Sequence, residues 1–538
     1  MAKENRDEFA NAWSTRASRC WSVISSTNRR NATNDRRAHR ERTDHLEGQP
    51  MATKLTRRAL LQTAGGMMAA AAVPGRPSAP AAAAATVGVI DQLAGYMAAA
   101  AGRDLPAEAV EHTKHHILDT FAAMISGAAL PPGRVALAFA RARTGEKVAT
   151  VAASDLLCGP IEAAMANGML AHSDETDDSH APSHSHPGCS VVLAALASGE
   201  QFGIDGTRLL RAVALGYDVG ARVTFTLGGL PFQIETHHSS HSIAGDFGAA
   251  AAAACAANLS ARQMRWVLDY AAQQASGIAA WQRDTEHIEK SLVFGGFPAR
   301  NGVSAVLLIQ LGATGVEDIL SGPDNFLAAF APKADPALLV DKLGERYEVT
   351  RTNIKKWTVG SPIQAPLDAI DNLRKRRPFD ADQVQQVVVR LATSEAKTVN
   401  GREMPDICLQ HMVAVMLLDK TASFEAAHDK PRMQDASILK HRAKVQLLPD
   451  EALERLYPRR EATVEITFID GTRLSEHVAA VRGTTDNPMT RQEVVAKARD
   501  LVTPVLGAAT AGRLIESVLN LETVTNVRSL RPFLQPSA

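Results

Sequence analysis

The residues best suited to chemistry lie in one short segment, residues 172–188, which reads HSDETDDSHAPSHSHPG. It gathers four histidines and four carboxylates between two stretches of helical periodicity, one ending near Leu170 and one beginning near Val191. A polar loop held between rigid elements is a common carrier of function. From the residues alone, three interpretations stay open: a solvated acidic turn, a metal site, and an acid–base catalytic loop.

The metal and acid–base interpretations make different demands on spacing. Imidazole and carboxylate groups suit zinc, manganese or iron, but the segment has no H-E-x-x-H pattern and no calcium-loop order of acids. Imidazole also gives or takes a proton near neutral pH, because its ordinary pKa is about 6.5. The five cysteines are scattered without a C-x-x-C pair, which argues against a disulfide framework, a zinc knuckle or an iron–sulfur cluster.

The composition is that of an ordinary globular protein. The chain has 538 residues, 45% of them hydrophobic, enough to bury a large core divided among two or three domains. Lys+Arg and Asp+Glu both total 58, so no net charge favours nucleic acid or an anionic membrane. A charged ligand must therefore be held by a local site.

The front of the chain is predicted to precede the fold. Residues 1–50 are polar and without apolar periodicity, which indicates a disordered extension. Residues 51–86 run from Thr56-Arg57-Arg58 through an apolar stretch of about 15 residues into an Ala/Pro-rich zone, the layout of a twin-arginine export signal and too short for a membrane anchor. We expect a periplasmic protein whose translation starts at Met51; the alternative is a disordered Ala/Pro linker and a cytoplasmic protein.

The remaining chain divides by its hydrophobic pattern. Residues 87–352 show helical periodicity, clearest at 107–125, 161–170, 191–202, 207–225 and 249–257, and predict an all-helical domain. Residues 353–488 include alternating stretches at 384–391 (VQQVVVRL) and 462–468 (ATVEITF), the second followed by an Asp470-Gly471 turn, and predict a smaller α+β domain. Residues 489–538 read as helices, opened by a Thr490–Glu493 capping box, that pack back on the helical domain.

Four segments, taken in order, resemble the MmgE/PrpD family, which includes 2-methylcitrate dehydratase and cis-aconitate decarboxylase. Residues 172–179 are similar to the signature H-x-x-D-[FY]-D-D-T, with Glu175 at the usual Asp and Ser179 at the usual Thr, and His186-Pro187-Gly188 follows as in the family. Residues 238–248 are similar to the segment before a F-G-A-A-A-A helix; His238 aligns with the family histidine, and His241 is the alternative.

The other two segments depart more from the family pattern. Residues 288–302 resemble the block K-R-L-H-x-G-x-A-A-x-N-G through Lys290, with one extra residue before Ala299 and no histidine at the usual position. Residues 356–368 resemble K-x-x-P-x-C-x-x-T-H-x-x-I-D, but Gln364 replaces the histidine. An amide can hydrogen-bond a carboxylate but cannot exchange a proton near neutral pH.

The resemblance implies a mainly helical fold with an inserted α+β lid, and a metal-independent, cofactor-free hydro-lyase that dehydrates a 2-methylcitrate-like acid. It also implies a homodimer and a small polycarboxylate as the only ligand. The implied catalytic residues are His186, His238, Lys290, Glu175 and Asp177. The implied substrate-binding residues are Asp178, Ser179, His241, Gln364 and His172. Decarboxylation or isomerisation of a cis-aconitate-like acid, and an exported binding protein without turnover, are the alternatives.

Overall fold

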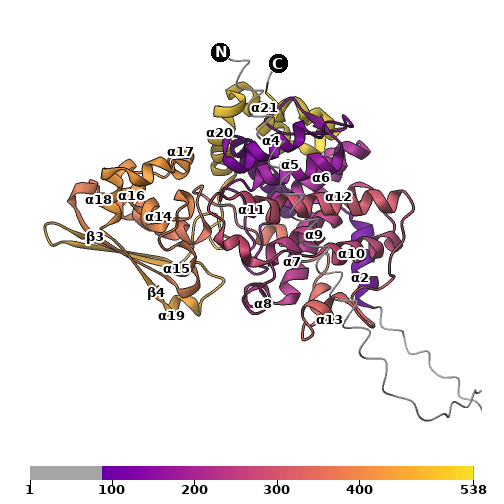
Figure 1. Cartoon of the computed structure of the whole chain (residues 1–538), viewed down its shortest axis with the longest axis horizontal. Coiled ribbons are helices and arrows are strands. Elements are labelled where there is room, and N and C mark those ends of the chain that lie inside the picture. Colours follow the sequence, from indigo (N-terminus) through magenta and orange to yellow (C-terminus); the bar gives the residue numbers. More distant parts are fainter. Residues whose placement is uncertain (1–87, 537–538) are drawn as a thin grey trace, which may run out of the picture. The chain divides into compact units, whose positions relative to one another are not determined.

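The computed structural model describes residues 88–536. The extension at 1–50, the export signal at 51–86 and the start at Met51 lie outside the described residues. The described chain is mainly helical with a small mixed sheet, which confirms the predicted fold class at that level (Figure 1).

Ten helices of eight or more residues make up the first region, and all five helical stretches predicted there are present. They are α2 (Val89–Ala100), α3 (Ala107–Ser126), α4 (Pro131–Arg141), α5 (Pro160–Ala171), α6 (Gly188–Phe202), α7 (Gly206–Leu227), α8 (Gly229–Thr236), α9 (Ser240–Ala256), α10 (Ala261–Gln274) and α12 (Phe297–Gln310). Shorter turns are η1 (Gly127–Ala129), η2 (Ala279–Arg283), α11 (Ile288–Ser291), α13 (Phe326–Phe330), η4 (Pro336–Leu339) and η5 (Glu348–Arg351). The region also holds one antiparallel pair, β1 (Ala149–Thr150) with β2 (Leu157–Cys158), so the all-helical prediction is wrong in this detail.

Helix α9 is the centre of the helical core. It packs against α7, α12 and α6, and the six consecutive alanines 249–254 are all buried. A methyl side chain permits this close approach and gives the highest helix propensity. The residue before the helix, Ser239, is its N-cap, and its hydroxyl accepts a hydrogen bond from the Ser242 backbone N–H, as a Ser N-cap does.

The second region is a four-stranded sheet with the order β4-β3-β5-β6, in which β3 and β4 are parallel and the other pairs antiparallel. Its strands are β3 (Val384–Ala392), β4 (Val445–Asp450), β5 (Ala462–Phe468) and β6 (Arg473–Val478). Alternate residues of β5 are buried against α14 (Ser361–Arg376), and α16 (Leu409–Asp419) packs on α14 and on β4 in the same core. The remaining elements are η6 (Ala381–Gln383), α15 (Thr393–Val399), η7 (Pro405–Ile407), α17 (Phe424–His428), η8 (Pro431–Gln434), α18 (Ala436–Arg442) and α19 (Glu451–Glu454).

The strands β3 and β5 and the hairpin into β6 were predicted and are confirmed, whereas β4 was missed. Strand β4 lies at the sheet edge, none of its residues is fully buried, and it carries Pro449. Edge strands tolerate proline and do not need an alternating pattern.

The end of the chain returns to the helical region. Helix α20 (Arg491–Leu506) packs against α3 and against α21 (Ala508–Leu519), and the predicted Thr490–Glu493 capping box is present. The last turns are η9 (Leu521–Thr523), η10 (Val527–Leu530) and α22 (Arg531–Leu534). Helix α21 also contacts α3, and in Figure 1 the yellow end of the chain lies among the violet helices from its front.

Candidate functional site

Residues 172–188 connect α5 to α6 inside the protein. His172 is the C-terminal cap of α5, and Pro187 is the residue before α6. All four carboxylates of the segment are at most 3% exposed. The solvated-turn interpretation is therefore wrong, because a solvated turn would expose its charges to water.

Asp177 joins two of the histidines. Its two oxygens accept hydrogen bonds from His172 Nδ1 at 2.8 Å and His186 Nδ1 at 3.1 Å. An ionised carboxylate can only accept hydrogen bonds, so each Nδ1 carries the proton. The Nε2 atom of each ring is then not used in the contact with Asp177. Burial opposes ionisation of Asp177, but His172 and His186 hold its pKa well below the ordinary value. Burial also lowers the pKa of His186 to about 4, so this imidazole is neutral at pH 7.

Glu175 lies between two buried lysines. Its Oε1 contacts Lys290 Nζ, and its Oε2 lies 3.3 Å from Lys355 Nζ, which also donates to the Glu175 backbone carbonyl at 2.8 Å. Although burial opposes the charge, Lys290 and Lys355 hold the pKa of Glu175 well below its ordinary value. Lys355 Nζ is also 3.8 Å from Asp177, so the two acids and two lysines form one connected group.

An aromatic ring packs the imidazoles together. Phe294 stacks on His241 with centroids 4.0 Å apart and on His172 at 4.6 Å, and the His186 and His241 rings are 5.2 Å apart. Lys290 Nζ lies 5.3 Å from the Phe294 ring centre. Phe294 belongs to η3 (Leu292–Gly296), a π-helical turn, which accommodates the extra residue noted in the sequence. Such turns occur often at functional sites.

His238 is not part of this group. Its ring stacks on Phe232 at 5.9 Å and faces Phe330 at 5.2 Å, whereas His241 is in contact with the other imidazoles. The structure therefore brings His241, the alternative, into the imidazole group and leaves His238 outside it. The different positions of the two histidines have a local cause. His238 precedes the N-cap Ser239, as His237 does, whereas His241 lies in the first turn of α9.

Two residues expected to bind substrate make hydrogen bonds with other groups of the protein. Gln364 accepts from the Trp357 N–H and donates to the carbonyls of Trp357 and Val359, so its amide is fully engaged with its own loop. Asp178 accepts from His116 Nδ1 at 2.8 Å, the Tyr217 hydroxyl at 2.5 Å and the Gly188 N–H at 3.0 Å. In the described chain the polar atoms of both side chains are therefore engaged by hydrogen bonds within the protein. Ser179 is buried and pairs through its backbone with Asn353.

Several residues at the site were missed in the sequence. His287 is 4% exposed, has a φ of 63°, and its ring is 5.1 Å from that of His172. It is the N-cap residue of α11, three residues before Lys290, and this closeness in the sequence could have identified it. Lys355 is adjacent to Lys356, which instead pairs with Asp368 and Asp371. From the sheet region, His428 lies 2.9 Å from Asp174 and the Tyr457 hydroxyl 3.5 Å from His184 Nδ1; nothing local in the sequence signals these long-range contacts.

The donor set of His172, Asp177 and His186 places one ligand atom of each within 4.8 Å of the others, a spacing that a metal ion could use. The chemistry of the surroundings opposes this. Both Asp177 oxygens already accept hydrogen bonds from the imidazoles, and the Lys355 ammonium group stands 3.8 Å from Asp177. A divalent ion there would meet a fixed positive charge.

Several imidazole nitrogens are buried without a hydrogen-bond partner among residues 88–536. Around Phe294 they are His172 Nε2, His241 Nδ1 and both nitrogens of His287. Unsatisfied buried polar atoms are costly and need an explanation. Beside two lysines, they form a set of groups able to hold the oxygens of a small acid and to move a proton.

Two domain models of one family together match most of the described chain. The MmgE/PrpD N-terminal domain matches residues 91–339, and the MmgE/PrpD C-terminal domain matches residues 357–523. Among curated proteins, a cis-aconitate decarboxylase-like protein (oryM) of Aspergillus oryzae is 26% identical, covering 79% of this chain and 93% of its own. The cis-aconitate decarboxylases of Aspergillus terreus and Homo sapiens are 23% and 25% identical, covering 83% and 79% of this chain and 96% and 90% of their own.

Proposed function

Because the chain belongs to the MmgE/PrpD family, we propose that it removes carbon dioxide from a small polycarboxylate of the cis-aconitate class. The family and its relatives make it an enzyme of the lyase kind. The observation that carries the choice of substrate class is the buried group of Lys290, Lys355 and the imidazoles. The relatives named as decarboxylases favour loss of carbon dioxide over loss of water.

The charge balance of the group explains how it would supply a proton. Glu175 and Asp177 are neutralised by Lys290 and Lys355, and His186 is uncharged at pH 7. A substrate carboxylate brings negative charge into this neutral interior and raises the pKa values of the imidazoles near it. An imidazole therefore takes up a proton as the substrate binds.

That proton is what decarboxylation requires. The bond between the carboxylate and its carbon breaks, carbon dioxide leaves, and the electron pair is spread over the neighbouring unsaturated acid. His186 or His241, as imidazolium, then gives its proton to the carbon. Lys290 and Lys355 balance the negative charge that moves toward the remaining carboxylate, and Asp177 holds the His186 ring by its Nδ1.

Dehydration of a hydroxy acid of the 2-methylcitrate kind is the second candidate. It is favoured by the pairing of two imidazoles on one carboxylate, Asp177, since one ring could remove a proton beside a carboxylate while the other protonates the departing hydroxyl. Both reactions need no metal in this proposal. Activity should therefore withstand chelators, and loss followed by recovery with one added metal would indicate a metal at His172, Asp177 and His186.

The test is to incubate the purified protein with a panel of di- and tricarboxylic acids and to determine product masses. We expect loss of carbon dioxide from a cis-aconitate-like acid; loss of water would select the second candidate. His186→Asn and Lys290→Met should each lower kcat by about 100-fold or more, and His237→Asn, on an exposed neighbour with a φ of 62°, is the matched control. Binding without any product, or full activity in both variants, would contradict the proposal.

A further inference from the structure

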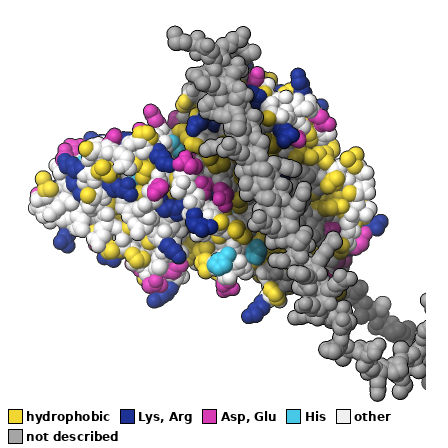
Figure 2. All heavy atoms as spheres, in the orientation of Figure 1, with side chains coloured by type: hydrophobic (Ala, Val, Ile, Leu, Met, Phe, Trp, Pro, Cys, Tyr) yellow, Lys and Arg dark blue, Asp and Glu magenta, His cyan; other side chains and the backbone are white. Residues whose placement is uncertain are grey.

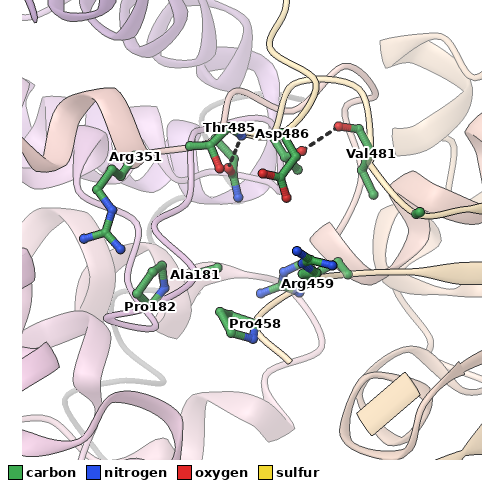
Figure 3. Close-up of a pocket in the computed structure, with 12 residues that line it drawn as sticks. Ala181, Pro182, Arg351, Pro458, Arg459, Val481, Thr485 and Asp486 are labelled. Atoms are coloured by element: carbon green, nitrogen blue, oxygen red, sulfur yellow. Dashed lines mark hydrogen bonds between the residues drawn. The ribbon is translucent and has the colours of Figure 1, made fainter. Parts of the chain in front are cut away.

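A pocket separate from the imidazole group lies where residues 458–460 meet the turn at 181–182. It has a volume of about 120 Å³. Figure 3 shows Arg351 and Arg459 on opposite sides of it, with Thr485 and Asp486 along one edge and Pro458 along the other. None of the imidazoles described above lines it.

Three arginines, Arg351, Arg459 and Arg460, line the pocket together with one carboxylate, Asp486. Arg351 is held by Glu348 at 2.8 Å and Arg460 by Glu395 at 3.0 Å, whereas Arg459 lies 3.9 Å from Glu461. The Arg460 Nε is buried without a hydrogen-bond partner in the described chain, and Thr484 and Thr485 add hydroxyl groups. Arginine in fixed positions is well suited to bind carboxylates.

The same two segments border both the pocket and the imidazole group. Tyr457, directly before Pro458, has its hydroxyl 3.5 Å from His184 Nδ1. The His184 ring lies 4.6 Å from that of His241. His184 lies in the same turn as Ala181 and Pro182, which line the pocket. Its φ is 52°, a backbone conformation that residues other than glycine rarely adopt. Occupancy of the pocket would thus act on the residues that hold His184.

We propose that this pocket is a second binding site for a small polycarboxylate anion, separate from the imidazole group and coupled to it through Tyr457 and His184. The choice of ligand class rests on the proposed function, whereas the existence of an anion site rests on the arginines alone. Inorganic phosphate is the other small anion that the same groups would attract, so the experiment uses both.

The experiment is a calorimetric titration of the full chain with tricarballylate, a tricarboxylate without a hydroxyl or double bond, and with phosphate. We expect two tricarballylate sites per chain. Arg351→Gln/Arg459→Gln should weaken one of them by about tenfold or more, while Lys290→Met weakens the other. Thr485→Glu, on an exposed residue, should weaken the same site as the arginine pair by placing a carboxylate at its edge.

The matched control is Arg143→Gln/Arg499→Gln, which removes the same charge from two exposed residues that do not line the pocket. It should retain both sites. A single site in the wild type, a second site that survives both pocket variants, or a second site that binds phosphate in preference to tricarballylate would overturn the proposal. Absence of turnover with every acid would contradict the proposed function while leaving the two-site titration decisive for this one.

Discussion

At the scale of the residue, Glu175 shows how one methylene group changes a site. The family signature has Asp at this position, and the longer side chain here reaches Lys290 with one oxygen and Lys355 with the other. The three residues come from segments far apart in the chain. Their meeting fixes where positive charge is available to a substrate.

Shortening Glu175 is the first prediction. Glu175→Asp keeps the charge but cannot reach both lysines, so we expect kcat to fall by about tenfold with the fold intact. Glu175→Gln removes the charge, leaves two buried ammonium groups with less compensation and should lower both kcat and the free energy of unfolding. Steady-state kinetics and urea unfolding on both variants check this. Equal activity of the Asp variant and the wild type would show that the second lysine contact is not needed.

At the scale of the element, the sequence predicted most helices and the central strands because these have strong periodicity. It also gathered His172, Glu175, Asp177, His186, His241 and Lys290, which the structure brings together. The sequence did not predict residues that reach the site from distant segments of the chain. It also did not distinguish two neighbouring histidines that lie on either side of a helix start. His238 and His241 differ only by their place relative to the N-cap Ser239, and His428 and Tyr457 reach the site only through tertiary packing.

The π-helical turn η3 depends on a close backbone contact. A methyl group on Gly295 would lie 2.1 Å from the Gly168 carbonyl oxygen of α5, a distance that forces the backbones apart. Gly295→Ala should therefore lower the free energy of unfolding by about 1–3 kcal/mol and displace Phe294. Gly512→Ala in α21, where a methyl group meets nothing within 4 Å, should raise stability by about 0.5–1 kcal/mol. Chemical unfolding of the pair checks the prediction, and equal effects would contradict it.

Helix α17 contributes a charge contact that depends on pH. Burial opposes the charge on His428, but Asp174 and Asp406 together with the Phe424 carbonyl raise its pKa to about 9. Because the folded pKa exceeds the ordinary 6.5, the stabilisation is complete below pH 6.5 and is lost as pH rises through about 9. His428→Gln should cost roughly 3 kcal/mol at pH 6 and almost nothing above pH 10.

Urea unfolding of His428→Gln and the wild type across that pH range is the measurement. His477→Gln, on a side chain that is 48% exposed, is the control and should show no comparable gap. A difference between His428→Gln and the wild type that stays constant with pH would mean that packing, rather than charge, accounts for the contribution of His428.

At the scale of the whole molecule, positive and negative charges are equal in number over the chain and lie close to one another in the structure (Figure 2). The chain has no net charge, and Figure 2 shows acidic and basic side chains interspersed over the described part of the visible face. Inside, the buried acids Glu175, Asp174, Glu395 and Asp119 are paired with lysines, arginines or histidines drawn from remote segments. These pairs link parts of the chain that hydrophobic periodicity alone could not place.

Lys497 is the clearest example of such a pair, because it joins α20, near the end of the chain, to α3, near its beginning. From α20 its Nζ lies 2.6 Å from the buried Asp119 of α3 and donates at 2.9 Å to the Thr176 carbonyl, within the segment that carries the imidazoles. Lys497→Met leaves Asp119 buried without its ammonium partner and should lower the free energy of unfolding by about 3–5 kcal/mol.

A double-mutant cycle separates the pair from its surroundings. Asp119→Asn in the Lys497→Met background removes the uncompensated charge, so we expect the double variant to be more stable than Lys497→Met alone. Since the Thr176 carbonyl still loses its donor in the double variant, activity should stay low even where stability returns. Urea unfolding and kcat measured on all four proteins give both quantities. Full additivity of the two substitutions would show that Lys497 and Asp119 do not act as a pair, and recovery of activity with stability would show that the Thr176 contact has no part in holding the imidazole segment.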